Sequence, residues 1–230
     1  MRIYSGFKEA LNEIRRDVAE MGIDVHPHSW QDKIVKDMPE FDTKEVQNYM
    51  YSVTSPNVDD LNPVQPWADG EFAERIAGAE TGKGVNPGEA YKDRYDVWQN
   101  FLTEEGKFGY SYSERFAKNL QVQSVINRIL TDPDSRQLWI SIWEPDDIKN
   151  LGGISRVPCS LGYQVQVRQG VLNLTYIQRS ADLVTHFEND VWMAHMMQRY
   201  ISEKTGIPIG VYTHIIFSLH MFRKDAEGIF

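Results

Sequence analysis

One stretch decides the fold: residues 156–182, RVPCSLGYQVQVRQGVLNLTYIQRSAD. Apolar and polar side chains alternate over Tyr163–Arg168 and again over Val171–Ile177, which is typical of β-strands that bury one face. Gln169-Gly170 separates the two runs, and a two-residue link of this kind predicts a tight hairpin. The stretch therefore predicts two neighbouring antiparallel strands, with Cys159 close to the start of the first strand.

Further elements flank this hairpin on both sides. Apolar residues at helical spacing predict helices, over Phe7–Met21, Glu71–Ala79, Glu114–Leu130 and Asp190–Lys204. Alternation predicts two more strands, Leu138–Trp143 and Val211–Phe217. Prolines are frequent in residues 24–70, which predicts short elements and loops there, and residues 81–88 have the composition of a loop. We expect an α+β fold with a mainly antiparallel or mixed sheet and packed helices.

Composition narrows the class of protein. A chain of 230 residues with 41% hydrophobic side chains predicts a single domain, residues 1–230, with a sizeable core. The net charge of −9 disfavours polymeric nucleic acid and anionic membranes as partners. One cysteine allows neither an intramolecular disulfide nor a cysteine-based zinc site. His26 and His28 lack an evident third ligand, so we expect no metal. With no signal-peptide pattern and no long apolar run, we expect a cytoplasmic protein.

Several short blocks carry residues that could do chemistry, and each has a simple structural explanation when taken alone. A lone cysteine is usually a small buried hydrophobe, a DPDS sequence is a turn that ends a helix, and Asp182 or Asp190 could cap a helix. The blocks are, in chain order, FGYSY at 108–112, DPDSR at 132–136, RVPC at 156–159, QRSAD at 178–182 and SLHMF at 218–222. Together, in this order, they resemble the thymidylate synthases and their relatives, the cytidylate hydroxymethylases.

The resemblance implies a thymidylate synthase-like fold and a homodimer that packs through its sheets. It also implies transfer of a one-carbon unit from 5,10-methylenetetrahydrofolate to C5 of a pyrimidine nucleoside monophosphate, without a metal. C5 of the pyrimidine ring becomes nucleophilic only after a thiolate adds to C6. By resemblance Cys159 supplies this thiolate. Arg179 would stabilise it, because a nearby guanidinium lowers the pKa of a thiol, and would also reach the phosphate.

The same resemblance assigns the remaining substrate contacts. Ser180 and Gln178 belong to the nucleotide-binding signature, and His220 would hold a sugar hydroxyl. Arg136 would bind the phosphate from the partner subunit, which suits the bidentate geometry of arginine. The positive field at the site would then be local, in an otherwise acidic chain.

Folate and proton transfer involve another group of residues. The resemblance places Asp182 against the pterin ring and Trp98 in the wall of the folate site. Tyr112 would help to remove the C5 proton. Glu74 matches the glutamate that relays protons through water, although Glu71 competes for this role.

The residue that reads the base lies eight positions after Asp182, which gives Asp190. Asparagine at this position suits uracil, because its amide can donate to O4 and accept from N3–H. Aspartic acid suits cytosine, since one oxygen accepts from the N4 amino group while the acid shares a proton with N3. A slip of one residue would place Asn189 there and return the choice to uracil.

Three departures from the family pattern keep other functions open. Ser160 follows the cysteine where thymidylate synthases have histidine, Gln137 replaces a second phosphate arginine, and Phe222 replaces the tyrosine that bonds the sugar. Phe222 leaves open whether the sugar is ribose or deoxyribose. Family members have a longer C-terminal segment that closes over the folate, so we expect that here either another element excludes water or water is admitted, as a hydroxymethylase needs. We therefore expect 5-hydroxymethylation of dCMP or CMP. The alternatives are methylation of dUMP or dCMP, or a non-catalytic nucleotide- or RNA-binding protein.

Overall fold

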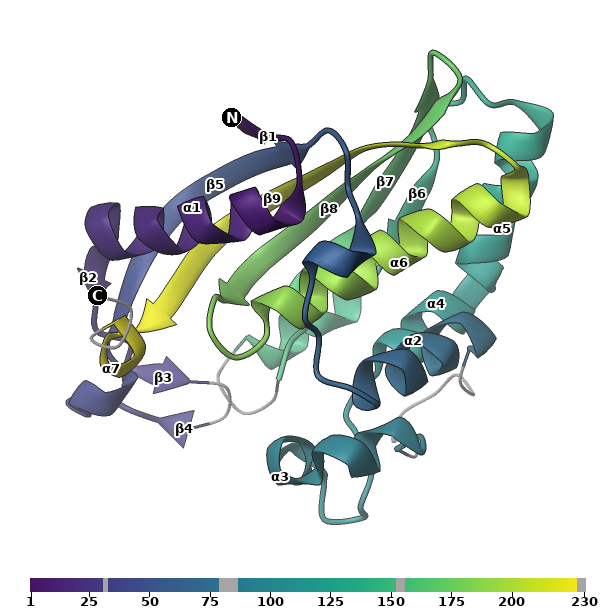
Figure 1. The fold of residues 1–230 in the computed structure, drawn as a ribbon. Helices are drawn as coiled ribbons and strands as arrows, with labels where there is room; N and C mark the ends of the chain where they lie inside the picture. The colour runs from purple at the N-terminus through teal and green to yellow at the C-terminus, as the bar shows by residue number, and fades with distance from the viewer. Residues whose placement is uncertain (31–32, 79–86, 152–155, 227–230) are drawn as a thin grey trace.

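The computed structural model describes residues 1–30, 33–78, 87–151 and 156–226. Over these residues the fold is α+β and is built on one seven-stranded mixed sheet (Figure 1). Its strands lie in the order β1-β5-β9-β8-β7-β6, and β2 pairs with the edge of β5. Their bounds are β1 Arg2–Tyr4, β2 Ile23–Val25, β5 Thr43–Val53, β6 Trp139–Ser141, β7 Ser160–Arg168, β8 Val171–Asp182 and β9 Ile209–Phe222. A separate small sheet consists of β3 Ser29–Trp30 and β4 Lys33–Ile34.

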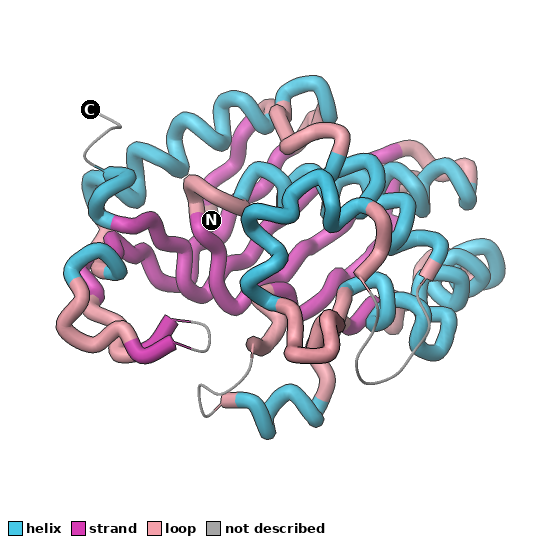
Figure 2. Tube along the Cα trace, turned by 90° about the horizontal axis from the view of Figure 1, so that it is seen from below, coloured by secondary structure: helices cyan, strands magenta, loops and turns pink. Residues whose placement is uncertain are grey.

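Helices flank the strands, which run side by side through the middle of the molecule (Figure 2). The α-helices are α1 Phe7–Met21, α2 Trp67–Ala77, α3 Tyr95–Trp98, α4 Tyr112–Ala117, α5 Gln121–Thr131, α6 Phe187–Thr205 and α7 Arg223–Ala226. Short 3-10 turns connect them, η1 Pro39–Phe41, η2 Val58–Asp60, η3 Ala90–Arg94, η4 Gln99–Phe101, η5 Lys118–Leu120 and η6 Pro145–Asn150. Helices α1 and α6 lie on the same face of the sheet (Figure 1).

The hairpin predicted from the central stretch is confirmed. β7 and β8 pair antiparallel, and Gln169 and Gly170 form the turn with φ of 53° and 75°. Positive φ at both central residues is the geometry that matches the twist of two adjoining strands. The pairs β8–β9 and β1–β5 are parallel, so the sheet is mixed, as expected.

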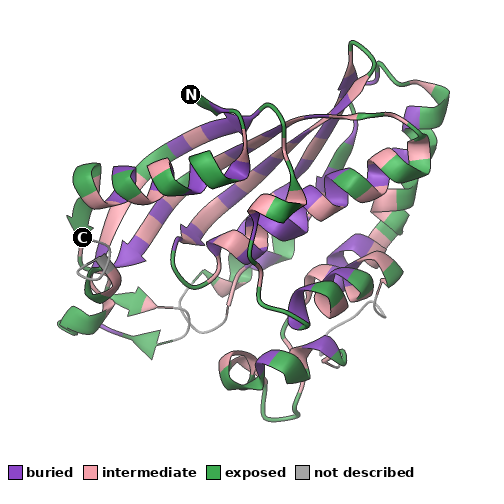
Figure 3. Cartoon of the chain, viewed as in Figure 1, coloured by how far each residue is buried: buried purple, intermediate pink, exposed green. Residues whose placement is uncertain are grey.

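The core lies between the sheet and its helices. Buried residues alternate along the strands and gather along α6 (Figure 3). Large side chains on β5, β8 and β9 are almost fully enclosed; Tyr51, Tyr176 and Tyr212 are each exposed by 1% or less. The predicted helix over Phe7–Met21 is confirmed, with the apolar face buried and Gly22 ending it. This packing holds the ends of β8 and β9 in fixed positions, where the pocket forms.

One prediction for the N-terminal part was wrong. Residues 24–70 contain an eleven-residue strand, β5, which runs beside β9 through most of its length. The pairing with β9 keeps one register along the whole strand, so Thr43 and Glu45, which line the pocket, lie on the same face as the buried Tyr49, Tyr51 and Val53. This face therefore changes from polar to apolar along the strand. The sequence pattern is therefore irregular although the strand is continuous.

Helix boundaries also differ from the predictions. The single helix expected over Glu114–Leu130 is two helices, α4 and α5, because Asn119 and Leu120 both have positive φ. Helix α6 begins at Phe187, one turn before the expected start, so Asp190 lies inside its first turn and does not cap it. Helix α2 likewise begins before Glu71, at Trp67. Most of the loop expected at residues 81–88 lies outside the described residues.

Candidate active site

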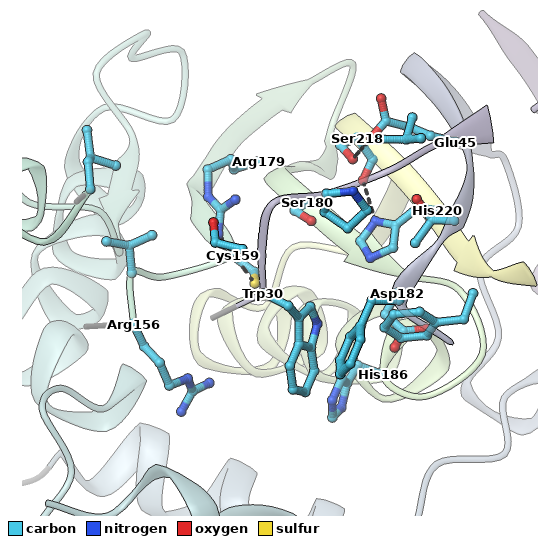
Figure 4. Close-up of a pocket in the computed structure, with 18 of the residues that line it drawn as sticks. Trp30, Glu45, Arg156, Cys159, Arg179, Ser180, Asp182, His186, Ser218 and His220 are labelled. Carbon is cyan, nitrogen blue, oxygen red and sulfur yellow. Dashed lines mark hydrogen bonds between the residues drawn. The ribbon is translucent and has the colours of Figure 1, made fainter. Parts of the chain in front are cut away.

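A pocket of about 410 Å³ opens where β8 and β9 end and α6 begins (Figure 4). This volume suits a small ligand. The side chains around it come from five parts of the chain that are distant in sequence. They include Trp30, Phe41, Thr43, Glu45, Arg156, Cys159, Arg179, Ser180, Asp182, His186, Asp190, Ser218, His220 and Phe222. Two arginines and two histidines thus share the pocket with three carboxylates.

Cys159 and Arg179 lie beside each other in this pocket (Figure 4). The backbone N–H of Arg179 donates to the Cys159 carbonyl at 2.7 Å, and the guanidinium Nη2 lies 3.8 Å from Sγ. Burial raises the pKa of the Cys159 thiol, whereas Arg179 and more weakly Arg156 act to lower it. The arginine acts in the expected direction, but burial has the larger effect in the pocket as it stands.

Asp190 reaches the pocket from the first turn of α6. Gln178 Nε2 donates to Asp190 Oδ2 at 2.9 Å. Burial raises the pKa of the Asp190 carboxyl, and His186 and the hydrogen bond from Gln178 oppose this rise. The buried Asn189 turns elsewhere, since its Oδ1 accepts from the backbone N–H of Val64 at 2.8 Å. Of these two candidate base-reading residues, the structure brings Asp190 into the pocket.

The β8–β9 pairing brings two predicted nucleotide contacts, Ser180 and His220, together with Ser218 and the predicted pterin contact Asp182. Ser180 pairs with Ser218 across the two strands, and Asp182 pairs with His220. All four side chains line the pocket. Oδ1 of Asp182 accepts from the backbone N–H groups of residues 184 and 185, which orients its carboxylate in the turn before α6.

Tyr112, on α4, contacts the start of β7. Its hydroxyl accepts from the backbone N–H of Ser160 at 3.3 Å, and its pKa is raised to about 12, mainly by burial. The guanidinium of Arg75 lies 4.7 Å from the centre of the Tyr112 ring. Arg75 in turn forms a 2.9 Å ion pair with Glu71. Glu71 is thereby linked to Tyr112 through one arginine.

Glu74 occupies a different place from the one expected. Its Oε1 accepts from the backbone N–H of Ala90 at 2.9 Å, and its carboxylate lies against Gly88. Neither Glu74 nor Glu71 is among the residues that line the pocket. The two glutamates are three residues apart on α2 and so lie on one face of the helix, but their carboxylates bind different partners, the Ala90 backbone and Arg75.

Trp98 borders the pocket indirectly. Its ring lies 6.0 Å from that of His186, which lines the pocket. The guanidinium of Arg156 lies 5.5 Å from the Trp98 ring and 3.9 Å from the Phe101 ring. Nε1 of Trp98 is buried and makes no hydrogen bond in the described residues. These aromatic rings hold Arg156 at the edge of the pocket by cation–π attraction.

Arg136 does not reach the pocket of its own chain. It lies exposed in the segment between α5 and β6 and is absent from the pocket lining. Its neighbour Gln137 is also exposed.

The structure adds pocket residues that the sequence did not indicate. Trp30 lies across from Cys159 (Figure 4), and its ring packs against Phe41 and Phe222. Glu45 accepts a hydrogen bond from Ser218, at the other end of the pocket. Glu45 lies on β5, a strand that the sequence pattern did not predict, so its place in the pocket was not predicted either. Trp30 lies in a two-residue strand, and no periodic pattern could have marked it.

The described residues show neither a metal-binding cluster nor a membrane-spanning helix. In those residues, no cluster of three histidine, cysteine, aspartate or glutamate side chains could hold a metal ion. None of the helices traced in those residues is long and apolar enough to cross a membrane.

Comparison with known families agrees with this geometry. Residues 85–229, more than half of the chain, match the model of the family described as thymidylate synthase. The chain belongs to the thymidylate synthase family.

Curated relatives and solved structures give the extent of the similarity. The chain is 27% identical over 142 residues to the thymidylate synthase of Bacillus mojavensis, and 26% identical over 142 residues to that of Bacillus phage phi3T. Each alignment covers 58% of this chain and 50% of the relative, so the chain spans about half the length of the curated relatives it matches. A structure of thermostable thymidylate synthase A from Bacillus subtilis superimposes with a TM-score of 0.76 at 19% identity, covering 97% of this chain and 82% of that one. The expected thymidylate synthase fold is thus confirmed.

Proposed function

We propose that this member of the thymidylate synthase family transfers a one-carbon unit from 5,10-methylenetetrahydrofolate to C5 of dCMP or CMP and releases the 5-hydroxymethyl nucleotide. The observation that carries the proposal is the presence of Asp190, instead of an amide side chain, in the pocket that contains Cys159 and Arg179. Asn189, the alternative residue, is bonded to the backbone of Val64.

Cys159 is the proposed nucleophile. Its thiol loses a proton and Sγ forms a bond to C6 of the ring, so that electron density moves to C5. Because burial raises the pKa of the Cys159 thiol, Arg179 at 3.8 Å is the group that favours the thiolate. Arg179 and Ser180 also form the phosphate end of the proposed nucleotide site.

Asp190 is the proposed reader of the base. Burial raises the pKa of its carboxyl, which favours the neutral acid. A neutral carboxyl offers one donor and one acceptor, and these match N3 and the N4 amino group of cytosine. A proton given to N3 also draws electron density out of the ring and eases the addition of Cys159 at C6. An unmatched polar pair in a buried site costs about 1–3 kcal/mol, which is a 5- to 150-fold preference.

Proton transfer at C5 falls to Tyr112 and a glutamate. The Tyr112 hydroxyl accepts a hydrogen bond from the Ser160 backbone N–H, and it is protonated at neutral pH because burial raises its pKa to about 12. We propose Glu71, not Glu74, as the glutamate that relays protons through water. The support is that Glu71 connects to Tyr112 through Arg75, whereas the carboxylate of Glu74 binds the Ala90 backbone.

The side chains around the pocket fit a reduced folate. A pterin needs a carboxylate for its ring nitrogens and flat apolar surfaces for its faces, and Asp182, Trp30 and His186 provide these in the pocket. The Trp98 ring lies next to that of His186, and its buried N–H has no hydrogen-bond partner among the described residues. Bound there, the folate would supply the one-carbon unit. Trp30 and Trp98 would exclude bulk water from its ring.

We further propose a homodimer that packs through the sheet. Helices α1 and α6 cover one face of the sheet (Figure 1), and side chains on the other face include Phe217, which is 46% exposed on β9, and Trp139, 40% exposed on β6. Exposed aromatic residues on sheet strands favour a protein contact. Arg136 of each subunit would then enter the partner's pocket, which explains its exposure in a single chain.

Methylation of dUMP is the second candidate, because the curated relatives are named thymidylate synthases. The test is the mass of the nucleotide formed from dCMP, CMP and dUMP with methylenetetrahydrofolate. We expect a cytidine nucleotide to gain about 30 Da, because a hydroxymethyl group replaces the C5 hydrogen through the Cys159 adduct. A gain of about 14 Da on dUMP would establish thymidylate synthesis and refute the proposal. No product from any of the three would favour a binding protein.

A further inference from the structure

A chain of hydrogen bonds runs from the pocket into the core. Gln178 Nε2 donates to Asp190 Oδ2 at 2.9 Å, and Gln178 Oε1 lies 2.9 Å from His214 Nε2. On the other side of the imidazole, Nδ1 of His214 lies 3.2 Å from the hydroxyl of Tyr51. Gln178, His214 and Tyr51 are fully enclosed, each with 0% exposure. Four elements, α6, β8, β9 and β5, thus contribute one residue each to a single polar path.

His214 fixes the direction of this path. Burial lowers its pKa to about 3, so the imidazole is neutral and has one N–H. An amide oxygen can only accept, so the N–H is on Nε2 and donates to Gln178 Oε1. Nδ1 then accepts from Tyr51. The three donors, Tyr51 Oη, His214 Nε2 and Gln178 Nε2, thus all point toward Asp190. Because Oε1 of Gln178 accepts from His214, its NH₂ group faces the carboxyl of Asp190.

The direction of the path determines where Asp190 carries its proton. In the neutral acid that the proposed reading of cytosine requires, Oδ2 accepts from Gln178 and the acidic proton is therefore placed on Oδ1. Cytosine presents an acceptor at N3 next to a donor at N4, whereas uracil presents a donor at N3 next to an acceptor at O4. A carboxyl whose proton could move to either oxygen would match both bases. A carboxyl with its proton fixed on one oxygen matches one of them.

We infer that His214 is a specificity-determining positioning residue, which selects cytosine over uracil by holding the Gln178 amide and thereby fixing the protonated oxygen of Asp190. This inference rests on the proposed function. His214 touches neither the pocket nor its ligand. It acts through Gln178, and no other titratable side chain of the described residues hydrogen-bonds to that amide besides Asp190.

The test compares equilibrium binding of dCMP and dUMP by calorimetry in wild type and in His214→Phe. Phenylalanine keeps a ring in the stack between Tyr176 and Phe187, whose ring centres lie 4.6 and 5.6 Å from that of His214, but it removes the N–H. We expect the ratio of the two dissociation constants to shift toward dUMP by about tenfold, because the Gln178 amide is free to turn. His214→Gln restores an N–H near the same position, and we expect it to recover most of the preference.

His195→Phe is the matched control. His195 is also buried, 1% exposed, and binds a glutamine, Gln198, which has no contact with Asp190. We expect it to leave the ratio unchanged. Tyr51→Phe, which removes only the hydroxyl at Nδ1, gives a second, smaller shift in the same direction if His214→Phe fails to fold.

Unchanged ratios in folded His214→Phe or Tyr51→Phe protein would overturn the inference, and so would an equal shift in His195→Phe. Failure of the proposed function is a separate result. If wild type binds dCMP more tightly but forms no 5-hydroxymethyl product, the proposed function is wrong, while the shift in the binding ratio still reports whether His214 controls the choice of base. Tighter binding of dUMP by wild type would refute the inference as well.

Discussion

Nη2 of Arg179 lies 3.8 Å from Sγ of Cys159, and this cation opposes the rise in thiol pKa that burial causes. Replacing Arg179 with Gln is expected to raise the pKa further and to lower the thiolate fraction at neutral pH roughly tenfold. Cys159 is the only cysteine, so the rate of alkylation by iodoacetamide against pH reports this thiol alone. Arg168→Gln, on the same pair of strands but outside the pocket lining, serves as the control. Equal alkylation profiles for wild type and Arg179→Gln would contradict the assignment.

The two glutamates of α2 give a matched pair. Glu71→Gln is expected to lower kcat by about a hundredfold, the usual size of a lost acid–base contribution, with little change in nucleotide binding. Glu74→Gln should affect mainly stability, because it weakens the hydrogen bond to Ala90. Steady-state kinetics and thermal melting of both variants check this. A large loss of kcat in Glu74→Gln alone would restore the original choice of relay.

Acid should destabilise the protein through its buried histidines. Burial lowers the folded-state pKa of His214 to about 3 and that of His195 to about 4, both from 6.5. Below pH 6.5 the unfolded chain binds protons that the folded chain does not, so stability falls as pH falls through this range. Each histidine contributes a slope of about 1.4 kcal/mol per pH unit until its folded pKa is reached. Chemical unfolding between pH 4 and 7 should show a smaller slope in His195→Phe, and an unchanged slope would rule out the neutral buried state.

Shared sites predict complementation between inactive subunits. Cys159→Ala lacks the nucleophile, and Arg136→Gln lacks the arginine offered to the partner. If the dimer is built as proposed, random exchange of the two variants restores about a quarter of wild-type activity, since half of the dimers then hold one complete pocket. No recovery after mixing, with dimers demonstrated by sedimentation, would place Arg136 outside the partner's site.

Much of the fold follows from local sequence pattern. The β7–β8 hairpin was predictable because Gln169-Gly170 separates two alternating runs, and α1 because its apolar residues recur at helical spacing. β5 was missed because one of its faces is polar where it lines the pocket, at Thr43 and Glu45, and apolar where it enters the core, at Tyr49 and Tyr51. The split between α4 and α5 depends on backbone angles at Asn119 and Leu120, which are not glycines and carry no warning in the sequence.

The candidate site was predictable where its residues lie in recognisable motifs. Cys159, Arg179 and Asp190 meet in one pocket because Cys159 precedes the start of β7, Arg179 lies near the end of its antiparallel neighbour β8, and Asp190 lies in the first turn of the following helix. The choice between Glu71 and Glu74 could be made only once the partners of each carboxylate were known. The place of Trp30 in the pocket depends on its packing against Phe41 and Phe222, which are distant in sequence.

The path through His214 was also beyond the sequence, because it joins four elements by side-chain hydrogen bonds. A histidine in the middle of a strand gives no sign of which side chains it contacts. Its role could be argued only once the register of β5, β8 and β9 was known.

The most direct test of the central claim is the release of tritium from [5-³H]dCMP and [5-³H]dUMP by wild type and by Asp190→Asn, each with methylenetetrahydrofolate. Wild type should release tritium faster from dCMP. In Asp190→Asn the preference for dCMP should be lost, because an amide has no acidic proton to share with N3 of cytosine. Faster release from dUMP by wild type, or an unchanged preference for dCMP in Asp190→Asn, would contradict the account of Asp190 as the residue that reads the base.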